Sequence, residues 1–136
     1  MRKAWLVAMS SLGLAACSPT ADLVQTDGAV AGFHNALNAG RFDPIYDGAA
    51  QDLKAAATRD KLNGLLTAVH RKLGAFKSGS RVGWNDNVTT GGHYVTVNYA
   101  ANYERGHANE EFVFRISDGK AALADYHVNS DALILN

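Results

Sequence analysis

The sequence predicts an α+β domain in which N-terminal helices pack on one face of a curved, four-stranded antiparallel sheet. Apolar residues recur at helical spacing before Gly74, and they alternate with polar residues after it. The chain has 136 residues, which is a typical length for one domain. Because helices come first and strands follow, the order favours an α+β arrangement over a parallel α/β one.

The first sixteen residues are expected to be a signal peptide. Arg2 and Lys3 give a positively charged start, and an uncharged, mostly apolar run from Ala4 to Leu14 follows. This run is too short to span a bilayer, which takes about 20 apolar residues. It closes with Leu14-Ala15-Ala16-Cys17, which is similar to a bacterial lipobox. Cleavage after Ala16 would leave Cys17 as an acylated N-terminus.

This resemblance implies a lipoprotein of the cell envelope that faces the periplasm and is held in a membrane by acyl chains such as palmitate on Cys17. Two or more acyl chains are needed for stable anchoring. Ser18 favours the outer membrane of a Gram-negative host, since aspartate at that position commonly retains lipoproteins in the inner membrane. We expect residues 17–26 to be the acylated N-terminus and a tether, residues 27–132 to be the single domain, and residues 133–136 to be a tail.

Three helices are expected before Gly74. The first spans residues 27–38, with Asp27 as N-cap, and its apolar stripe consists of Val30, Phe33 and Leu37. A short alanine-rich helix spans residues 49–57. The third helix spans residues 58–73 and has a broad apolar face. Thr58 is its candidate N-cap, and Gly74 ends it.

Four strands are expected after Gly74, and they span residues 76–87, 93–104, 110–117 and 121–128. Gly79 and Gly83 predict a bulge or bend in the first strand. Residues 105–109 are expected to form a hairpin loop, and Asp118-Gly119 is a strong signal for a two-residue turn. Each strand should therefore pair with the next, and the bent sheet can curl into a cup.

Three segments resemble the nuclear transport factor 2-like (cystatin-like) superfamily. They are Leu73-Gly74 followed directly by a strand, the alternating Tyr94-Val95-Thr96-Val97-Asn98-Tyr99, and the closing stretch from Glu111 to Ser130. The likeness spans about residues 27–132 and points to a branch of domains of unknown function. It implies the cup-shaped fold and a sheet-face dimer, but it does not imply a particular function, because this fold hosts many. Ala121 and Ala122 stand where many members have a tryptophan.

The side chains expected to line the cup are Phe33, His34, Tyr99, Tyr103 and Tyr126. An enzyme of this superfamily, ketosteroid isomerase, uses an acid and a tyrosine in its cup, but no residue here matches that pattern. Asp125 precedes Tyr126 on one strand, so the two should point to opposite faces. We therefore assign no catalytic residue.

We also assign no metal ligand, no cofactor and no nucleic-acid partner. The five histidines show no short spacing that is typical of metal sites. The formal net charge is +0, so the chain as a whole lacks the basic surplus of nucleic-acid-binding proteins.

The preferred function is a non-catalytic module that binds a small apolar ligand or a protein. Two alternatives stay open: an isomerase- or hydrolase-type enzyme that uses polar residues of the cup, and a structural subunit of envelope assembly. Tyr94, Val113 and Trp84 are candidates for an apolar patch on the outer sheet face, which predicts a homodimer through that face.

Overall fold

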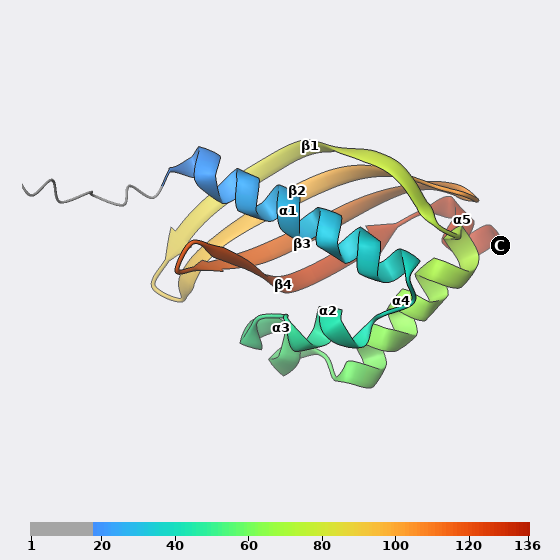
Figure 1. The fold of residues 1–136 in the computed structure, drawn as a ribbon, viewed down its shortest axis with the longest axis horizontal. Coiled ribbons are helices and arrows are strands. Elements are labelled where there is room, and N and C mark those ends of the chain that lie inside the picture. The colour runs from blue at the N-terminus through green and yellow to red at the C-terminus, as the bar shows by residue number, and fades with distance from the viewer. Residues whose placement is uncertain (1–17) are drawn as a thin grey trace, which may run out of the picture.

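Four antiparallel strands form one curved sheet in the order β1-β2-β3-β4, and α1 crosses one of its faces (Figure 1). The computed structural model describes residues 18–136. The strands are β1 (Phe76–Thr89), β2 (Gly92–Tyr103), β3 (Gly106–Ser117) and β4 (Lys120–Asn129). The helices are α1 (Pro19–Asn38), α2 (Asp43–Asp47), α3 (Gln51–Ala56), α4 (Arg59–Leu73) and α5 (Asp131–Leu135). The α+β class and the meander of consecutive hairpins are confirmed.

Helix α1 is longer than the sequence analysis predicted. It begins at Pro19, not after Asp27, and it runs for 20 residues. Proline suits the first helical position because its fixed φ is helical and the missing N–H has no partner there. Thr26 and Val30 are buried one turn apart on the sheet side of the helix, so its early turns pack as well as its later ones. The segment expected to be a tether is therefore helical from residue 19.

The predicted boundaries of α4 are confirmed at both ends. The Thr58 hydroxyl accepts a hydrogen bond from the backbone N–H of Lys61 at 3.3 Å, which caps the helix. Gly74 follows the last turn with a φ of +75°, and a Cβ there would lie 2.9 Å from the side chain of Glu104. Both the backbone conformation and the close approach therefore require glycine.

The sheet confirms the predicted bulging of β1 and one predicted turn, and it corrects one predicted loop. Strand β1 has register shifts between Phe76 and Ser78 and between Arg81 and Gly83, as the glycines in this segment predicted. Asp118 and Gly119 have φ values of 52° and 69°, which fits a two-residue hairpin turn with two positive φ angles. The expected loop at residues 105–109 is wrong, because β2 and β3 continue until Tyr103 pairs with Gly106.

Apolar side chains of α1, α4 and the inner sheet face form one core. Its fully buried members include Leu37, Leu66, Val97, Phe112 and Phe114. The C-terminal residues expected to be a tail belong instead to α5, where Leu133 packs against this core. Within residues 18–136, no helix has the length and apolar character needed to cross a membrane. The predicted signal peptide and the Ala16–Cys17 cleavage site lie outside the described residues.

Candidate functional site

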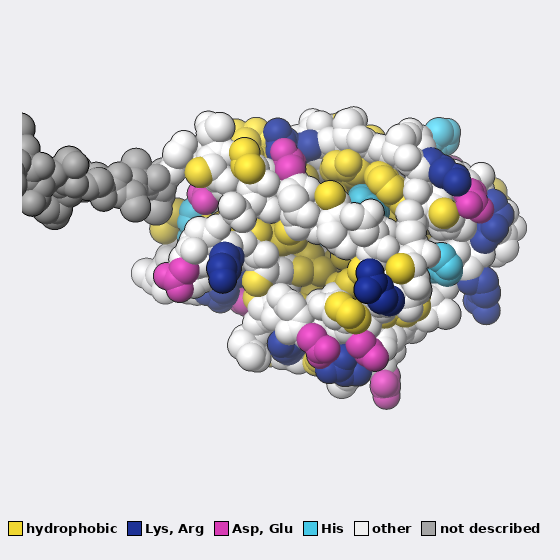
Figure 2. Space-filling model, viewed as in Figure 1, with side chains coloured by type: hydrophobic (Ala, Val, Ile, Leu, Met, Phe, Trp, Pro, Cys, Tyr) yellow, Lys and Arg dark blue, Asp and Glu magenta, His cyan; other side chains and the backbone are white. Residues whose placement is uncertain are grey.

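An apolar cleft opens between α1, α2 and the β3–β4 side of the sheet, and Figure 2 shows its hydrophobic floor. Its volume is about 210 Å³. Phe33 projects from α1, Ile45 comes from α2, and Phe114 and Leu123 come from the sheet. None of the lining residues has a charged side chain; the others are Ala29, Gly32, Ala36, Pro44, Gly48 and Ala121.

Small residues keep this cleft open. Ala29, Gly32 and Ala36 follow one another along the cleft side of α1, three and four residues apart, so they lie on one helix edge. A Cβ at Gly32 would meet nothing within 4 Å. Ala121 stands at one of the two positions where the resemblance led us to expect a tryptophan in many relatives. A small side chain there leaves room that an indole would fill.

Behind the cleft, the carboxylate of Glu110 is buried in a polar cluster with His34, Tyr103 and Tyr126. The side chain of Glu110 is 0% exposed. The hydroxyls of Tyr103 and Tyr126 donate to its Oε1 at 2.6 and 2.7 Å, and Nε2 of His34 lies 2.8 Å from its Oε2. Three partners on one carboxylate offset much of the cost of burying it.

The two tyrosines of this cluster act as neutral donors. Burial, reinforced by the negative carboxylate of Glu110, raises the pKa of Tyr103 and of Tyr126 well above the usual value of about 10. The ring of Phe33 packs 4.7 Å from that of Tyr126 and also lines the cleft. Phe33 therefore contacts both the apolar cleft and Tyr126, which is one of the donors to the buried carboxylate.

Of the five side chains expected to line the cup, only Phe33 lines this cleft. His34, Tyr103 and Tyr126 surround Glu110 instead. Tyr99 packs against His34, with ring centroids 5.5 Å apart. The sequence analysis missed Glu110, although the alternation of β3 places it on the inner face with Phe112. Asp125 is exposed while Tyr126 is buried, as the alternation predicted.

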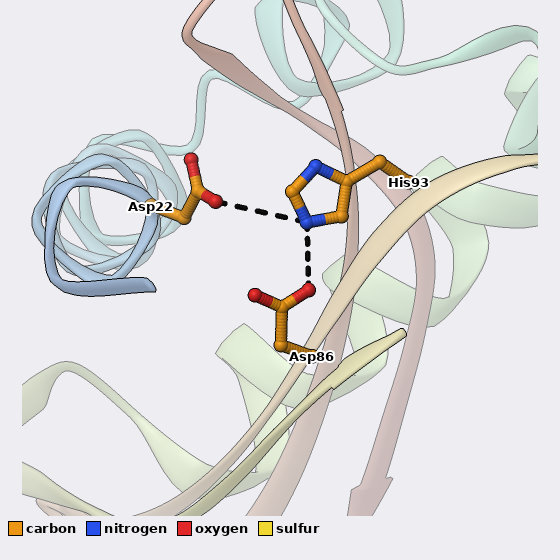
Figure 3. A group of neighbouring side chains, drawn as sticks. All are labelled: Asp22, Asp86 and His93. Atoms are coloured by element: carbon orange, nitrogen blue, oxygen red, sulfur yellow. Dashed lines mark hydrogen bonds and ion pairs between the residues drawn. The ribbon is translucent and has the colours of Figure 1, made fainter. Parts of the chain in front are cut away.

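A second polar group lies at the other end of α1, and Figure 3 shows its three side chains pointing toward one another. Nε2 of His93 is 2.6 Å from Oδ1 of Asp86 and 3.6 Å from Oδ2 of Asp22. Asp22 comes from the first turns of α1, Asp86 from β1 and His93 from β2. No short sequence spacing joins these residues, so the sequence analysis did not find them.

A third polar group holds α3 against the sheet. Arg115 donates to both carboxylate oxygens of Asp52, at 2.7 and 2.8 Å, and the hydroxyl of Tyr94 donates to the same carboxylate at 2.9 Å. The Arg115 guanidinium lowers the pKa of Asp52 well below its usual value. This group ties secondary structure together and borders no part of the cleft.

The expected apolar patch on the outer sheet face does not form as predicted. Tyr94 is half-buried beneath Arg115, whose guanidinium lies 4.7 Å from its ring. Trp84 pairs with Val97, and directly paired residues share a face, so Trp84 lies on the inner face. Val113 is therefore the one residue of the three that lies on the outer face and is not covered by a cationic side chain.

A comparison with known protein families finds a match that covers residues 31–124, and the family is described as a protein of unknown function, DUF3887. The chain belongs to the DUF3887 family. The DUF3887 region contains nine of the ten residues that line the cleft, together with His34, Tyr103 and Glu110. Asp22 and Tyr126 lie outside it. No curated protein matches the chain. The likeness to nuclear transport factor 2-like proteins stays a prediction.

Proposed function

We propose that this protein is a lipid-anchored protein of the cell envelope that binds a small apolar ligand in the cleft between α1, α2 and the sheet. The observation that carries the proposal is the open, uncharged lining of that cleft. Sites for small molecules are usually concave, preformed and mostly apolar. When an apolar group fills such an exposed apolar hollow, apolar surface is removed from water and the free energy of the system falls.

The volume limits the size of the ligand. An apolar cavity of about 150 Å³ is large enough to bind benzene. The cleft, at about 210 Å³, therefore suits a single aromatic ring or a short alkyl segment. A larger amphipathic molecule would fit if its apolar end entered the cleft and its polar end stayed in water.

The lipobox-like motif and the start of α1 support a position close to a membrane. Cys17 and Pro19 are two residues apart, so an acylated Cys17 would hold the N-terminus of α1 within about 7 Å of the anchor. Gly32 lies thirteen residues farther along the helix, or about 20 Å. A ligand could thus pass between the bilayer and the cleft over a short distance.

Filling the cleft from Gly32 tests the binding proposal. The Gly32→Leu side chain has open space to enter, and it should displace the ligand. Gly64→Leu on α4 is the matched control, because a Cβ there also meets nothing within 4 Å and the residue does not line the cleft. Native mass spectrometry of the detergent-extracted proteins should show a retained small molecule on the wild type and on Gly64→Leu, but not on Gly32→Leu. Equal retention on both variants, or none on the wild type, would reject binding in the cleft.

The anchor has its own test. The intact protein should carry the added mass of acyl chains and should fractionate with membranes, whereas Cys17→Ser should lose both properties. If Cys17→Ser still sediments with membranes, or if the wild type has no added mass, the anchoring half of the proposal is wrong.

The enzyme alternative is not favoured by the geometry, because the carboxylate of Glu110 is already bonded to three partners and its side chain is 0% exposed. The structural alternative would be supported by a protein that co-purifies while the cleft holds no ligand. The predicted homodimer through the sheet face is tested in the same spectra, which count the subunits.

A further inference from the structure

We propose that Asp22, Asp86 and His93 form a binding site for one divalent transition-metal cation, with Zn²⁺ as its representative. The site lies at the N-terminal end of α1, and none of its residues lines the apolar cleft. This inference therefore goes beyond ligand binding in the cleft and does not depend on it.

Three separate elements bring the donor atoms together. His93 pairs with Val88, and Asp86 lies two residues from Val88 on β1, so His93 and Asp86 are diagonal neighbours on the inner face. Asp22 reaches the same point from α1 (Figure 3). One ligand atom from each of these side chains lies within 4.8 Å of the others.

The carboxylate of Asp22 is the observation that points to a ligand. Its side chain is 10% exposed, and it points at His93. Among residues 18–136, no side chain or backbone group donates a hydrogen bond to the Asp22 carboxylate. The ion-pair partner that it has in this part of the chain is Nε2 of His93, at 3.6 Å. A carboxylate that keeps only a tenth of its surface in water and has no hydrogen-bond donor among these residues is poorly solvated, so a cation beside it would stabilise it.

A proton on His93 cannot serve both carboxylates. Nε2 carries at most one hydrogen, and Asp86 lies at hydrogen-bond distance, 2.6 Å, while Asp22 lies beyond it. Within the described part of the chain, no lysine or arginine forms an ion pair with Asp22 or Asp86. The cluster therefore holds two carboxylates and no permanent positive charge, and a dication between the three donors would balance it.

The donor set selects the type of cation. One imidazole nitrogen and two carboxylate oxygens are ligands that zinc accepts, with the fourth tetrahedral position left for water. Imidazole is a poor ligand for Ca²⁺ and Mg²⁺, which prefer oxygen donors. Zinc bonds of about 2.0–2.2 Å place neighbouring donors roughly 3.4 Å apart. The 3.6 Å contact already fits this spacing, and the 2.6 Å contact would open by less than an ångström as the cation replaces the hydrogen bond.

A cation at this site would join α1 to the β1–β2 hairpin. The side chains of His93 and Asp86 are 17% and 22% exposed, so a metal ion can enter from solvent. Since the cation would bind the folded chain and not the separated donors, it would raise the melting temperature. At a hundredfold excess over the dissociation constant, we expect a rise of about 10 °C.

The test uses the full-length protein, extracted in detergent, stripped with EDTA and then titrated with Zn²⁺ alone. We expect one Zn²⁺ per chain by calorimetry and by elemental analysis after dialysis. Asp22→Asn and Asp86→Asn should each weaken binding by about tenfold or more and should abolish the rise in melting temperature. Melting in EDTA shows whether each variant is folded, and His93→Gln replaces any variant that is not.

Asp125→Asn is the matched control. Asp125 and His127 form an exposed Asp–His pair, 2.9 Å apart, and no third metal ligand from residues 18–136 lies within reach of it. This variant should bind Zn²⁺ as the wild type does. The proposal fails if the wild type retains no zinc, if Asp22→Asn binds as tightly as the wild type, or if Asp125→Asn weakens binding as much as Asp86→Asn does. Equal displacement of Zn²⁺ by Ca²⁺ would reject a transition-metal site.

Discussion

Removing one hydroxyl from the buried cluster around Glu110 should lower the free energy of unfolding of the domain measurably. Tyr126→Phe deletes a donor that lies 2.7 Å from Oε1 of Glu110 and leaves Tyr103 and His34 as the remaining partners. The Glu110 side chain is 0% exposed, so water cannot reach it to replace the lost donor. A hydrogen bond to a charged group contributes about 1.5–3 kcal/mol, and we expect a loss of about 2 kcal/mol in the free energy of unfolding.

For a domain of this length, a loss of about 2 kcal/mol lowers the melting temperature by about 8 °C. Urea unfolding followed by circular dichroism measures the loss in the free energy of unfolding directly. Tyr99→Phe is the control, because Tyr99 packs against the same His34 but donates no hydrogen bond to Glu110; its change should stay within about 0.5 kcal/mol. If both variants lose the same amount, or if Tyr126→Phe is neutral, the three-partner description of Glu110 is wrong.

Three further changes test other parts of the structure. Gly32→Ala should raise the free energy of unfolding by about 0.5–1 kcal/mol in urea unfolding, because alanine favours a helix over glycine and its Cβ meets nothing here. Thr58→Ala should lower it by about 1 kcal/mol, since the capping hydroxyl of α4 is lost, and thermal melting would show this. Asp52 has a pKa in the folded state below its value of about 3.9 in the unfolded chain, so its bond to Arg115 stabilises the fold above about pH 4 and is lost on acidification. Asp52→Asn should therefore be less stable near neutral pH, and its stability should fall less between about pH 5 and pH 3; an equal fall would contradict this assignment.

Local sequence signals were sufficient for most of the fold. The helical repeat of α4, its Thr58 cap and the Asp118-Gly119 turn are each encoded within a few neighbouring residues, and the structure has all three. The start of α1 was missed because its early turns have few large apolar residues. These turns are held by tertiary packing, as the burial of Thr26 shows.

The polar groups could not be predicted from spacing alone. Glu110 is separated from His34 by 76 residues, and its burial depends on the register of β3 against its neighbours. The alternation of β3 could have placed Glu110 on the inner face, but nothing local says that two tyrosines converge on it. Asp22 could not be joined to Asp86 and His93, because it lay in a segment that was not expected to be helical.

Ligand contact at Ile45 tests the central claim most directly. The chain has three isoleucines: Ile45 lines the cleft, Ile116 packs against the core and Ile134 is 79% exposed on α5. Selective labelling of their methyl groups gives three NMR signals, and a small aromatic probe such as toluene can be titrated into the detergent-extracted protein. Binding in the cleft predicts a saturable shift of the Ile45 methyl signal while Ile134 stays unchanged. A shift of Ile134 without one of Ile45, or no saturable shift at all, would contradict the proposed function.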